Sequence, residues 1–307
     1  MSILRLNRQP TGMADSMLNT LKDSVGELGT IPTLPDAALK AMAALKDPDC
    51  SLDLLAGIIG RDPALTAGIL RLANSALYRT GRTIQSIEQA VFRLGTRECQ
   101  NLILTVSMQS MFRRVGKAQQ AACERLWRHS LLTASLCRRL NSELTLGFNG
   151  EEFACGIGHD LGRILIVLVA FEAFQRADPL DFEEGPGILE REQSVLGTDH
   201  CFFGAWYASM NQLPASMINA VQFHHRVPEA GEAAPLVSLV ATADHMANHL
   251  QRGLSISEYT PRLNTGLEFL TARLTEKQKE WFDGHLHALM ESTLEEVGEL
   301  EPSCAPA

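Results

Sequence analysis

The feature that most constrains the fold of this chain is a histidine next to an aspartate, His159 and Asp160, inside the apolar run ACGIGHDLGRILIVLVAF. An ionised carboxylate in apolar surroundings needs a partner charge, several hydrogen-bond donors or a metal ion, because its desolvation is otherwise too costly. Further candidate ligands lie far apart along the sequence, at His129, His200, His224, His225 and Asp244. Such a distribution indicates a metal site built by several helices in the interior of an all-helical domain.

Composition and charge narrow the class of protein. The chain has 307 residues, enough for two domains or one large one. Its hydrophobic fraction of 45% and charged fraction of 21% are typical of a globular protein. The formal net charge of −9 gives no overall basic character, so we expect neither a nucleic-acid partner nor docking to an anionic membrane surface.

Cysteine usage and the termini indicate the compartment. The seven cysteines form no CxxC pair, and several lie in apolar helical patterns, where a free thiol behaves as a small hydrophobic side chain. This favours a reducing compartment. The first 16 residues contain no apolar core of a signal peptide, and the apolar stretch 164–171 is far too short to cross a bilayer. We therefore expect a cytoplasmic protein without a membrane segment.

Apolar residues recur at helical spacing along almost the whole chain. Asp62 followed by Pro63 predicts a helix start, with Asp62 as the N-cap and Pro63 in the first turn. Ser86 and Gln89 have the spacing of a capping box, and Gly95 is expected to end the helix that they begin. No alternating β-branched run is long enough to indicate a strand. The sequence therefore predicts an all-α fold.

A polar stretch around residues 113–120 is the best candidate for a linker between two helical lobes. It divides an N-terminal lobe, residues 20–115, from a second lobe, residues 120–298. The helices predicted in the second lobe cover residues 123–141, 151–176, 187–210, 214–225, 235–250 and 275–298. Residues 1–19 and 299–307 are expected to be flexible.

Each candidate ligand also has a structural explanation when it is considered alone. His129 could be a hydrogen-bonded histidine of the core, and His224 and His225 could interact with the dipole at the end of a helix. Asp244 could form a buried ion pair with Arg128 or Arg138. All of these residues together could form a polar network without a metal. Their combination favours the metal site, because each additional polar residue in an apolar helix must find a partner.

The order His129, His159–Asp160, Asp244 resembles the metal-binding pattern of the HD superfamily of metal-dependent phosphohydrolases. Over residues 25–250 the chain is more narrowly similar to HDOD-domain proteins, which are bacterial signalling relatives of that superfamily. The similarity is found in the segments IPTLPDAALKAM, IIGRDPALTAGILRLANSALYRT, SIEQAVFRLGTRECQNLIL, LWRHSLLTAS, GIGHDLGRILI, LGTDHCFFGAWYASMNQLP and AVQFHH.

The resemblance implies a fold and a general role. It implies two helical lobes, of which the second is HD-like, and a regulatory protein of bacterial signal transduction that acts through binding a protein partner or a ligand. Hydrolysis is less expected, because HDOD proteins are mostly regulatory. The alternative is a metal-dependent phosphohydrolase that acts on a nucleotide or another phosphoester.

The resemblance also implies a set of ligands. It assigns a first divalent metal, which would be iron, manganese or a similar ion, to His129, His159, Asp160 and Asp244. A second ion has His200 and either His224 or His225 available. If the protein is an enzyme, Arg163 and His200 would stabilise the charge of a phosphate.

Two departures from the family patterns reduce the expectation of catalysis. The phosphohydrolase pattern resembles HDxGK, whereas this chain has Arg163 in place of the lysine. A guanidinium is a planar fork and does not simply replace a compact ammonium at a phosphate. HD-GYP proteins continue past their paired histidines into a Gly-Tyr-Pro loop, whereas this chain reads HHRVPEAGEAAP. Cyclic di-GMP hydrolysis is therefore not expected.

The first lobe supplies the candidate surface for a signalling partner. In the segment RLANSALYRTGR, the hydrogen-bonding side chains of Arg71, Asn74, Tyr78 and Arg79 are the predicted partner-binding residues. The alternative for Asn74 is that it terminates and caps a helix.

Overall fold

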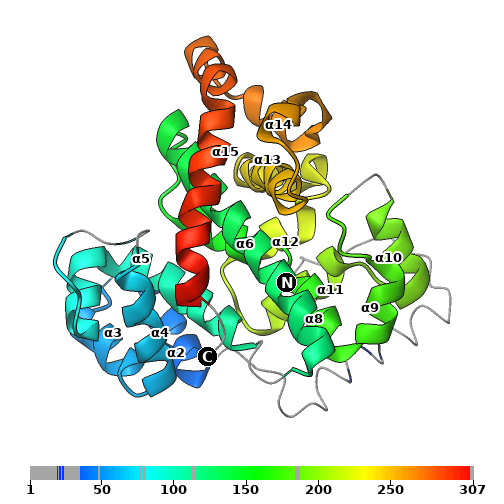
Figure 1. Cartoon of the computed structure of the whole chain (residues 1–307). Coiled ribbons are helices and arrows are strands. Elements are labelled where there is room, and N and C mark those ends of the chain that lie inside the picture. Colours follow the sequence, from blue (N-terminus) through cyan, green and yellow to red (C-terminus); the bar gives the residue numbers. More distant parts are fainter. Residues whose placement is uncertain are drawn as a thin grey trace.

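The computed structural model of this chain describes residues 19, 21, 23, 35–47, 49–75, 78, 81–111, 115–183 and 187–304, the last five of these by their backbone alone. Across these residues every regular element is a helix and no strand occurs (Figure 1). The prediction of an all-α fold is therefore confirmed. No described helix is both long enough and apolar enough to span a membrane.

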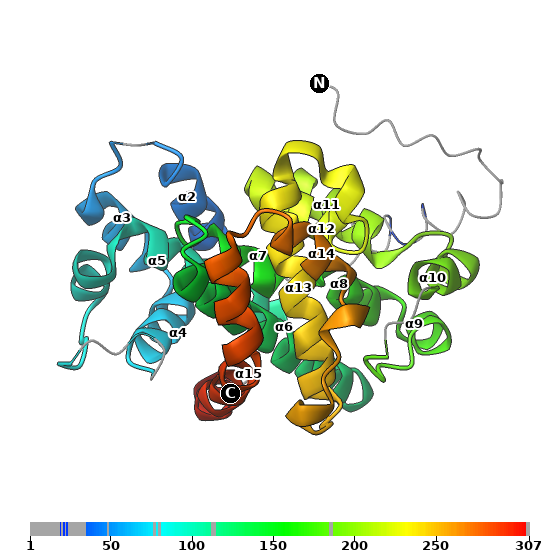
Figure 2. The same ribbon diagram turned by 90° about the horizontal axis from the view of Figure 1, so that it is seen from above.

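The first lobe forms a separate group of helices at one side of the molecule in both views (Figures 1 and 2). Its described helices are α2 (Asp36–Ala44), α3 (Leu52–Ile59), α4 (Pro63–Ala73) and α5 (Ile87–Ser110). The predicted caps are confirmed, since Asp62 accepts backbone hydrogen bonds at the start of α4 and Ser86 does so at the start of α5. The backbone of α5 departs from helical geometry at Gly95, where φ is 79°.

The second lobe is arranged around helix α6. Its α-helices are α6 (Lys117–Leu144), α7 (Glu151–Gly158), α8 (Leu161–Val169), α9 (Phe171–Ala177), α10 (Ile188–Leu196), α11 (His200–Met210), α12 (Ala215–Phe223), α13 (Ala234–Gln251), α14 (Thr265–Thr271) and α15 (Glu276–Cys304). Short 3-10 turns lie at Val227–Ala233, Ile256–Glu258 and Pro261–Leu263. Helices α7, α8, α13 and α15 all pack against α6, and α15 also contacts α4 of the first lobe.

Two of the long helices predicted from the sequence are divided in the structure. The segment 151–176 forms α7, α8 and α9, because the backbone leaves helical geometry at Asp160 (ψ 18°) and at Ala170 (ψ 48°). The segment 187–210 forms α10 and α11, because Gly197 adopts a positive φ of 69° and Asp199 then caps α11. Hydrophobic periodicity continues across these breaks, which is why it did not predict them.

The ends of the chain also differ from expectation in one respect. Gly298 does not end the last helix, and the backbone of 299–304 continues α15. The other segments expected to be flexible, residues 1–18 and 305–307, lie outside the described residues.

Helices α8 and α11 cross at very short distance, and this crossing positions the centre of the second lobe. A Cβ atom added to Gly162 would lie 1.8 Å from the carbonyl oxygen of His200, and one added to Gly204 would lie 2.7 Å from the backbone nitrogen of Gly162. Only glycine leaves room for such an approach. The crossing holds the first residue of α11, His200, next to the start of α8 and therefore next to Asp160.

Candidate metal centre

The structure brings the predicted metal ligands together in the interior of the second lobe. Their positions are His129 in α6, His159 and Asp160 between α7 and α8, His200 at the start of α11, His224 and His225 after α12, and Asp244 in α13. All of them are buried except His225, which is half-buried. Ligands that are distant in sequence therefore share one site.

The break between α7 and α8 explains how adjacent residues can face the same site. In a continuous helix, His159 and Asp160 would project about 100° apart. Because Asp160 lies outside helical geometry, with φ −94° and ψ 18°, the chain turns between the two residues. The Asp160 carboxylate lies 3.7 Å from His159 Nε2 as a result.

A first group of donors combines α6, α13 and the α7–α8 junction. His129 Nε2 lies 3.0 Å from Asp244 Oδ1 and 3.2 Å from His159 Nε2. His159 Nε2 lies 3.5 Å from Asp244 Oδ1, and Asp160 Oδ2 lies 3.7 Å from both imidazoles. Atoms bound to one ion at about 2.0–2.2 Å are separated by similar distances.

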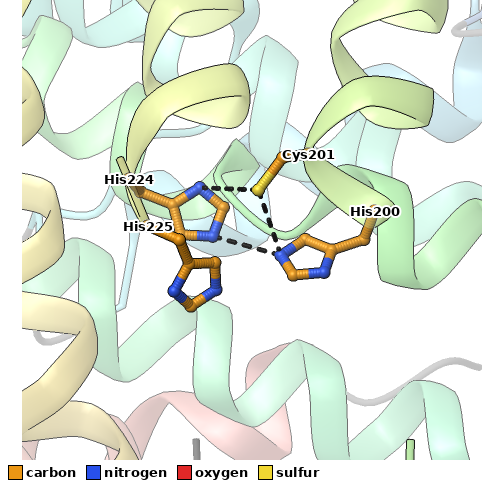
Figure 3. A group of neighbouring side chains, drawn as sticks. All are labelled: His200, Cys201, His224 and His225. Carbon is orange, nitrogen blue, oxygen red and sulfur yellow. Dashed lines mark hydrogen bonds between the residues drawn. The ribbon is translucent and has the colours of Figure 1, made fainter. Parts of the chain in front are cut away.

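A second group of donors lies on the other side of Asp160. His200 Nε2 is 3.3 Å from His224 Nε2, and Asp160 Oδ1 is 3.7 Å and 3.8 Å from these two nitrogens. The ring of His225 lies alongside that of His224, with 4.3 Å between centroids (Figure 3). Asp160 thus faces the first group with Oδ2 and the second group with Oδ1.

Hydrogen bonds on the outer side of three imidazoles orient them toward the centre. His159 Nδ1 donates to the carbonyl oxygen of Gly156 at 2.8 Å, and His224 Nδ1 donates to that of Ala220 at 3.0 Å. His200 Nδ1 donates to the carboxylate of Glu192 at 2.8 Å. A neutral imidazole that donates through Nδ1 presents a lone pair on Nε2, which is the usual arrangement around a bound metal.

The centre fits a divalent cation on its own geometry. The Nε2 atoms of His200 and His224 face one another at 3.3 Å, so either a proton or a cation must lie between them. Asp160 Oδ1 is buried and has no hydrogen-bond partner among the described residues. A buried carboxylate oxygen without a partner is costly, and an ion between these atoms would satisfy all of them.

The charges of the centre indicate where protons lie when no metal is bound. Burial lowers the pKa of His159, but the neighbouring Asp160 and Asp244 carboxylates outweigh it and raise that pKa to about 9. Burial and the adjacent His200 lower the pKa of His225 to about 3. Burial and neighbouring imidazoles also hold the pKa of His224 well below its ordinary value. His159 therefore carries a proton at neutral pH, and a metal would displace it.

Arg163 bonds to two buried carboxylates. Its Nη1 donates to Asp160 Oδ2 at 2.9 Å, and its Nε donates to Asp178 Oδ2 at 2.8 Å. The guanidinium is 1% exposed and lies over the ring of Phe182, 5.4 Å from the ring centroid. Arg163 was predicted to bind phosphate if the protein is an enzyme, and that role stays a prediction. In the structure its guanidinium is a counter-charge of Asp160.

Sequence reasoning missed several residues of the centre. Glu192 orients His200, Asp178 holds Arg163, and the ring of Phe182 lies 5.1 Å from that of His129. No local pattern predicts these contacts, because they depend on how α10 and the segment after α9 fold back onto the site. Cys201 was also missed, although its position next to His200 was visible in the sequence.

The predicted partner-binding residues lie away from this centre. Asn74 ends α4 and bonds through its side chain to Leu70 and Ile84, so the capping alternative describes its role. Tyr78 is 6% exposed and faces the second lobe, with its ring centroid 6.4 Å from that of Phe153. Arg71 is half-buried on α4, and Arg79 lies outside the described residues.

An all-helical fold whose interior collects histidines and aspartates defines a helical protein with a candidate metal centre. Comparison with protein families narrows this class, since residues 31–227 match the model of the HDOD domain. The chain therefore belongs to the HDOD domain family, as the sequence resemblance predicted.

Known proteins are similar to this chain in sequence or in fold. An uncharacterized protein of Treponema pallidum (strain Nichols) is 27% identical over 262 residues. The match covers 84% of this chain and 48% of the Treponema protein, so this chain spans about half the length of that relative. An HDOD domain protein of unknown function from Geobacter sulfurreducens superposes with a TM-score of 0.69 at 22% identity, covering 92% of this chain and 98% of that one. A candidate phosphohydrolase from Shewanella amazonensis SB2B superposes with a TM-score of 0.67 at 24% identity, covering 91% and 98%. At these identities the solved structures show a shared fold.

Proposed function

We propose that this protein is a regulatory HDOD protein of signal transduction whose second lobe binds divalent metal at the His/Asp centre. The observation that carries the proposal is the buried convergence of donors on both oxygens of Asp160, one of which has no partner among the described residues. When bound, a divalent metal would supply positive charge to this centre and lower the pKa of a bound water. His129, His159, Asp160 and Asp244 would hold one ion, and His200 and His224 a second.

The enclosure of the donors favours a regulatory role over catalysis. A catalytic metal keeps an open coordination position, whereas a structural one is closed by protein ligands. Asp244 is the most exposed of the six ligands just named, and only 5% of its surface is accessible. Phe182 packs over His129, and the donors of Arg163 are directed to carboxylates.

A cavity beside the centre supports the ligand-binding part of the proposal. It has a volume of about 420 Å³, and its lining includes Phe182, His245, Asn248 and Arg252. Asn248 is buried and donates to the metal-ligand candidate Asp244 at 3.2 Å. A molecule bound in the cavity could therefore contact Asn248, which itself bonds to a candidate ligand of the metal centre.

Elemental analysis of the protein purified without chelator or affinity nickel tests the proposal. We expect about one or two divalent ions per wild-type chain and their loss in the His159→Ala/Asp160→Ala variant. The matched control is Asp283→Ala/His285→Ala, which removes the same residue types at exposed positions of α15. A wild-type protein without metal, or equal metal in all three proteins, would contradict the assignment.

The second candidate function is metal-dependent hydrolysis of a phosphoester. It is favoured by the position of Asp160 between two groups of imidazoles, because two-metal hydrolytic sites use such a shared carboxylate. A phosphatase and phosphodiesterase screen of the metal-loaded protein separates the two candidates. Turnover that disappears in the His159→Ala/Asp160→Ala variant would support hydrolysis, and its absence in the loaded wild type would support the regulatory role.

A further inference from the structure

Cys201 lies inside the second group of donors, directly after His200 in α11. Its side chain is completely buried. Its Sγ lies 3.4 Å from His200 Nε2 and 4.0 Å from the ring of His224, measured to Nδ1 (Figure 3). None of the ligand assignments above uses this sulfur.

His200 Nε2 lies at ligand-like separations from three neighbouring donor atoms, and His200, Cys201, His224 and His225 each offer a ligand atom within 4.8 Å of the others. His200 Nε2 is 3.4 Å from the sulfur, 3.3 Å from His224 Nε2 and 3.7 Å from Asp160 Oδ1. A tetrahedral ion with nitrogen ligands at 2.0–2.1 Å and sulfur at 2.3 Å separates its ligand atoms by about 3.3–3.6 Å. These three distances from His200 Nε2 agree with the expected values to within a few tenths of an ångström.

Asp160 provides evidence for an ion that is independent of the cysteine. Its Oδ1 lies 3.7 Å and 3.8 Å from the Nε2 atoms of His200 and His224, on a carboxylate that is 1% exposed. No described residue donates a hydrogen bond to this oxygen. A cation at this position would be bound by a carboxylate oxygen, two imidazoles and a thiolate.

We propose that Cys201 is a ligand, through its thiolate, of the ion held by Asp160, His200 and His224. This inference rests on the proposed metal centre and specifies the chemistry of its second group. When the ion binds, the S–H bond is replaced by a bond between sulfur and the metal, the proton leaves to solvent, and no oxidation state changes. The coordination is thus mixed, with one sulfur among nitrogen and oxygen.

A thiolate ligand determines which metals the second group prefers. Soft sulfur ligands favour zinc, cobalt and ferrous iron, whereas manganese and magnesium favour oxygen ligands. The first group, made of His129, His159, Asp160 and Asp244, contributes only nitrogen and oxygen. The two groups should therefore differ in selectivity, and the second should retain zinc or cobalt in competition with manganese.

Cobalt(II) substitution of the full chain tests the ligand directly. The protein is stripped with a chelator, reloaded with cobalt(II), and examined for the near-ultraviolet charge-transfer band of a cobalt–thiolate bond. We expect this band in the wild type and in Cys123→Ser, which alters another buried cysteine outside the centre. We expect its loss in Cys201→Ser, together with a zinc affinity reduced by about 100-fold and a manganese affinity changed by less than about threefold.

The outcomes separate this inference from the proposed function. If elemental analysis shows that the wild type binds no cobalt, the metal centre itself is refuted. If the wild type binds cobalt but its spectrum has bands in the visible range and no near-ultraviolet charge-transfer band, the metal centre stands and the thiolate ligand is refuted. The same holds if the charge-transfer band persists in Cys201→Ser. Cadmium-113 NMR of the wild type gives the same answer without a variant, because a bound sulfur moves the cadmium resonance strongly downfield of its position with nitrogen and oxygen ligands.

Discussion

At the scale of single residues, Asp160 faces different partners with its two oxygens. Oδ2 accepts from Arg163 and lies near His129 and His159, while Oδ1 faces His200 and His224. Burial raises its pKa, but Arg163 and the imidazoles together hold that pKa well below its ordinary value. The carboxylate is therefore ionised whether or not a metal is bound, and Arg163 is its permanent neutralising partner.

Removing Arg163 should be among the most damaging single changes in the chain. The Arg163→Met variant leaves the buried carboxylates of Asp160 and Asp178 without their guanidinium. We expect a loss of about 3–5 kcal/mol in the free energy of unfolding, measured by chemical denaturation of the metal-free protein. The surface change Arg273→Ala should alter it by less than about 0.5 kcal/mol. Equal effects of both changes would show that the buried contacts of Arg163 with the two carboxylates contribute nothing to the free energy of unfolding.

The protonated state of His159 predicts how metal affinity depends on pH. Its pKa is raised to about 9 in the protein without metal, so at neutral pH an ion must displace a proton. The affinity for the ion held by His159 should therefore rise with pH up to about 9, by about tenfold per pH unit for each proton released. Competition with a chelator of known affinity at pH 6.5, 7.5 and 8.5 measures this slope. An affinity independent of pH would show that metal binding displaces no proton from His159.

At the scale of elements, the contact between α8 and α11 determines where His200 lies. Gly162→Ala would place a methyl group 1.8 Å from the His200 carbonyl oxygen and force the two helices apart. We expect a loss of metal comparable to that caused by changing a ligand, although Gly162 binds nothing, together with a lower melting temperature. Metal content and thermal unfolding measure the two effects.

Gly284→Ala is the matched control for this prediction. Gly284 lies in α15, and an added Cβ would meet nothing within 4 Å. Replacing an exposed glycine within a helix by alanine should stabilise the protein by about 0.5–1 kcal/mol and leave its metal content unchanged. If both alanine variants behaved alike, the short crossing of α8 and α11 would not control the centre.

The sequence predicted the helices better than their breaks. Starts that depend on local hydrogen bonds, at Asp62 and Ser86, are confirmed, because the capping residue and its partners are close in sequence. The breaks at Asp160 and Gly197 were missed, because apolar periodicity continues on both sides of them. The order of the histidines and aspartates identified the donors that converge. It could not identify Glu192 or Asp178, which reach the centre only through tertiary packing.

At the scale of the whole molecule, the two lobes meet through buried aromatic contacts. Tyr78 of the first lobe packs edge-on against Phe153 of α7. The guanidinium of Arg138 in α6 lies over the Tyr78 ring, 5.5 Å from the centroid of that ring. Burial, with a further contribution from the nearby Glu98, raises the pKa of Tyr78 far above its ordinary value, so its hydroxyl stays neutral. This contact joins the first lobe to two helices of the second lobe.

Tyr78→Ala should weaken the attachment of the first lobe without removing the metal. We expect a loss of about 3 kcal/mol in the free energy of unfolding. The first thermal unfolding transition should occur at a lower temperature, and the metal content should be unchanged. Phe92→Ala is the control, because Phe92 is 79% exposed and its truncation should have little effect. A Tyr78→Ala protein as stable as the Phe92→Ala protein would show that the lobes are held together by other contacts.

The contact of α5 with α7 has a consequence for communication across the molecule. Helix α5 belongs to the first lobe, and α7, which it touches, has 8 residues and is followed directly by His159. A helix of that length is about 12 Å long. One short helix therefore connects the first lobe to the proposed metal ligand His159. A shift of α5 caused by a docked molecule would meet α7, and no loop separates α7 from His159.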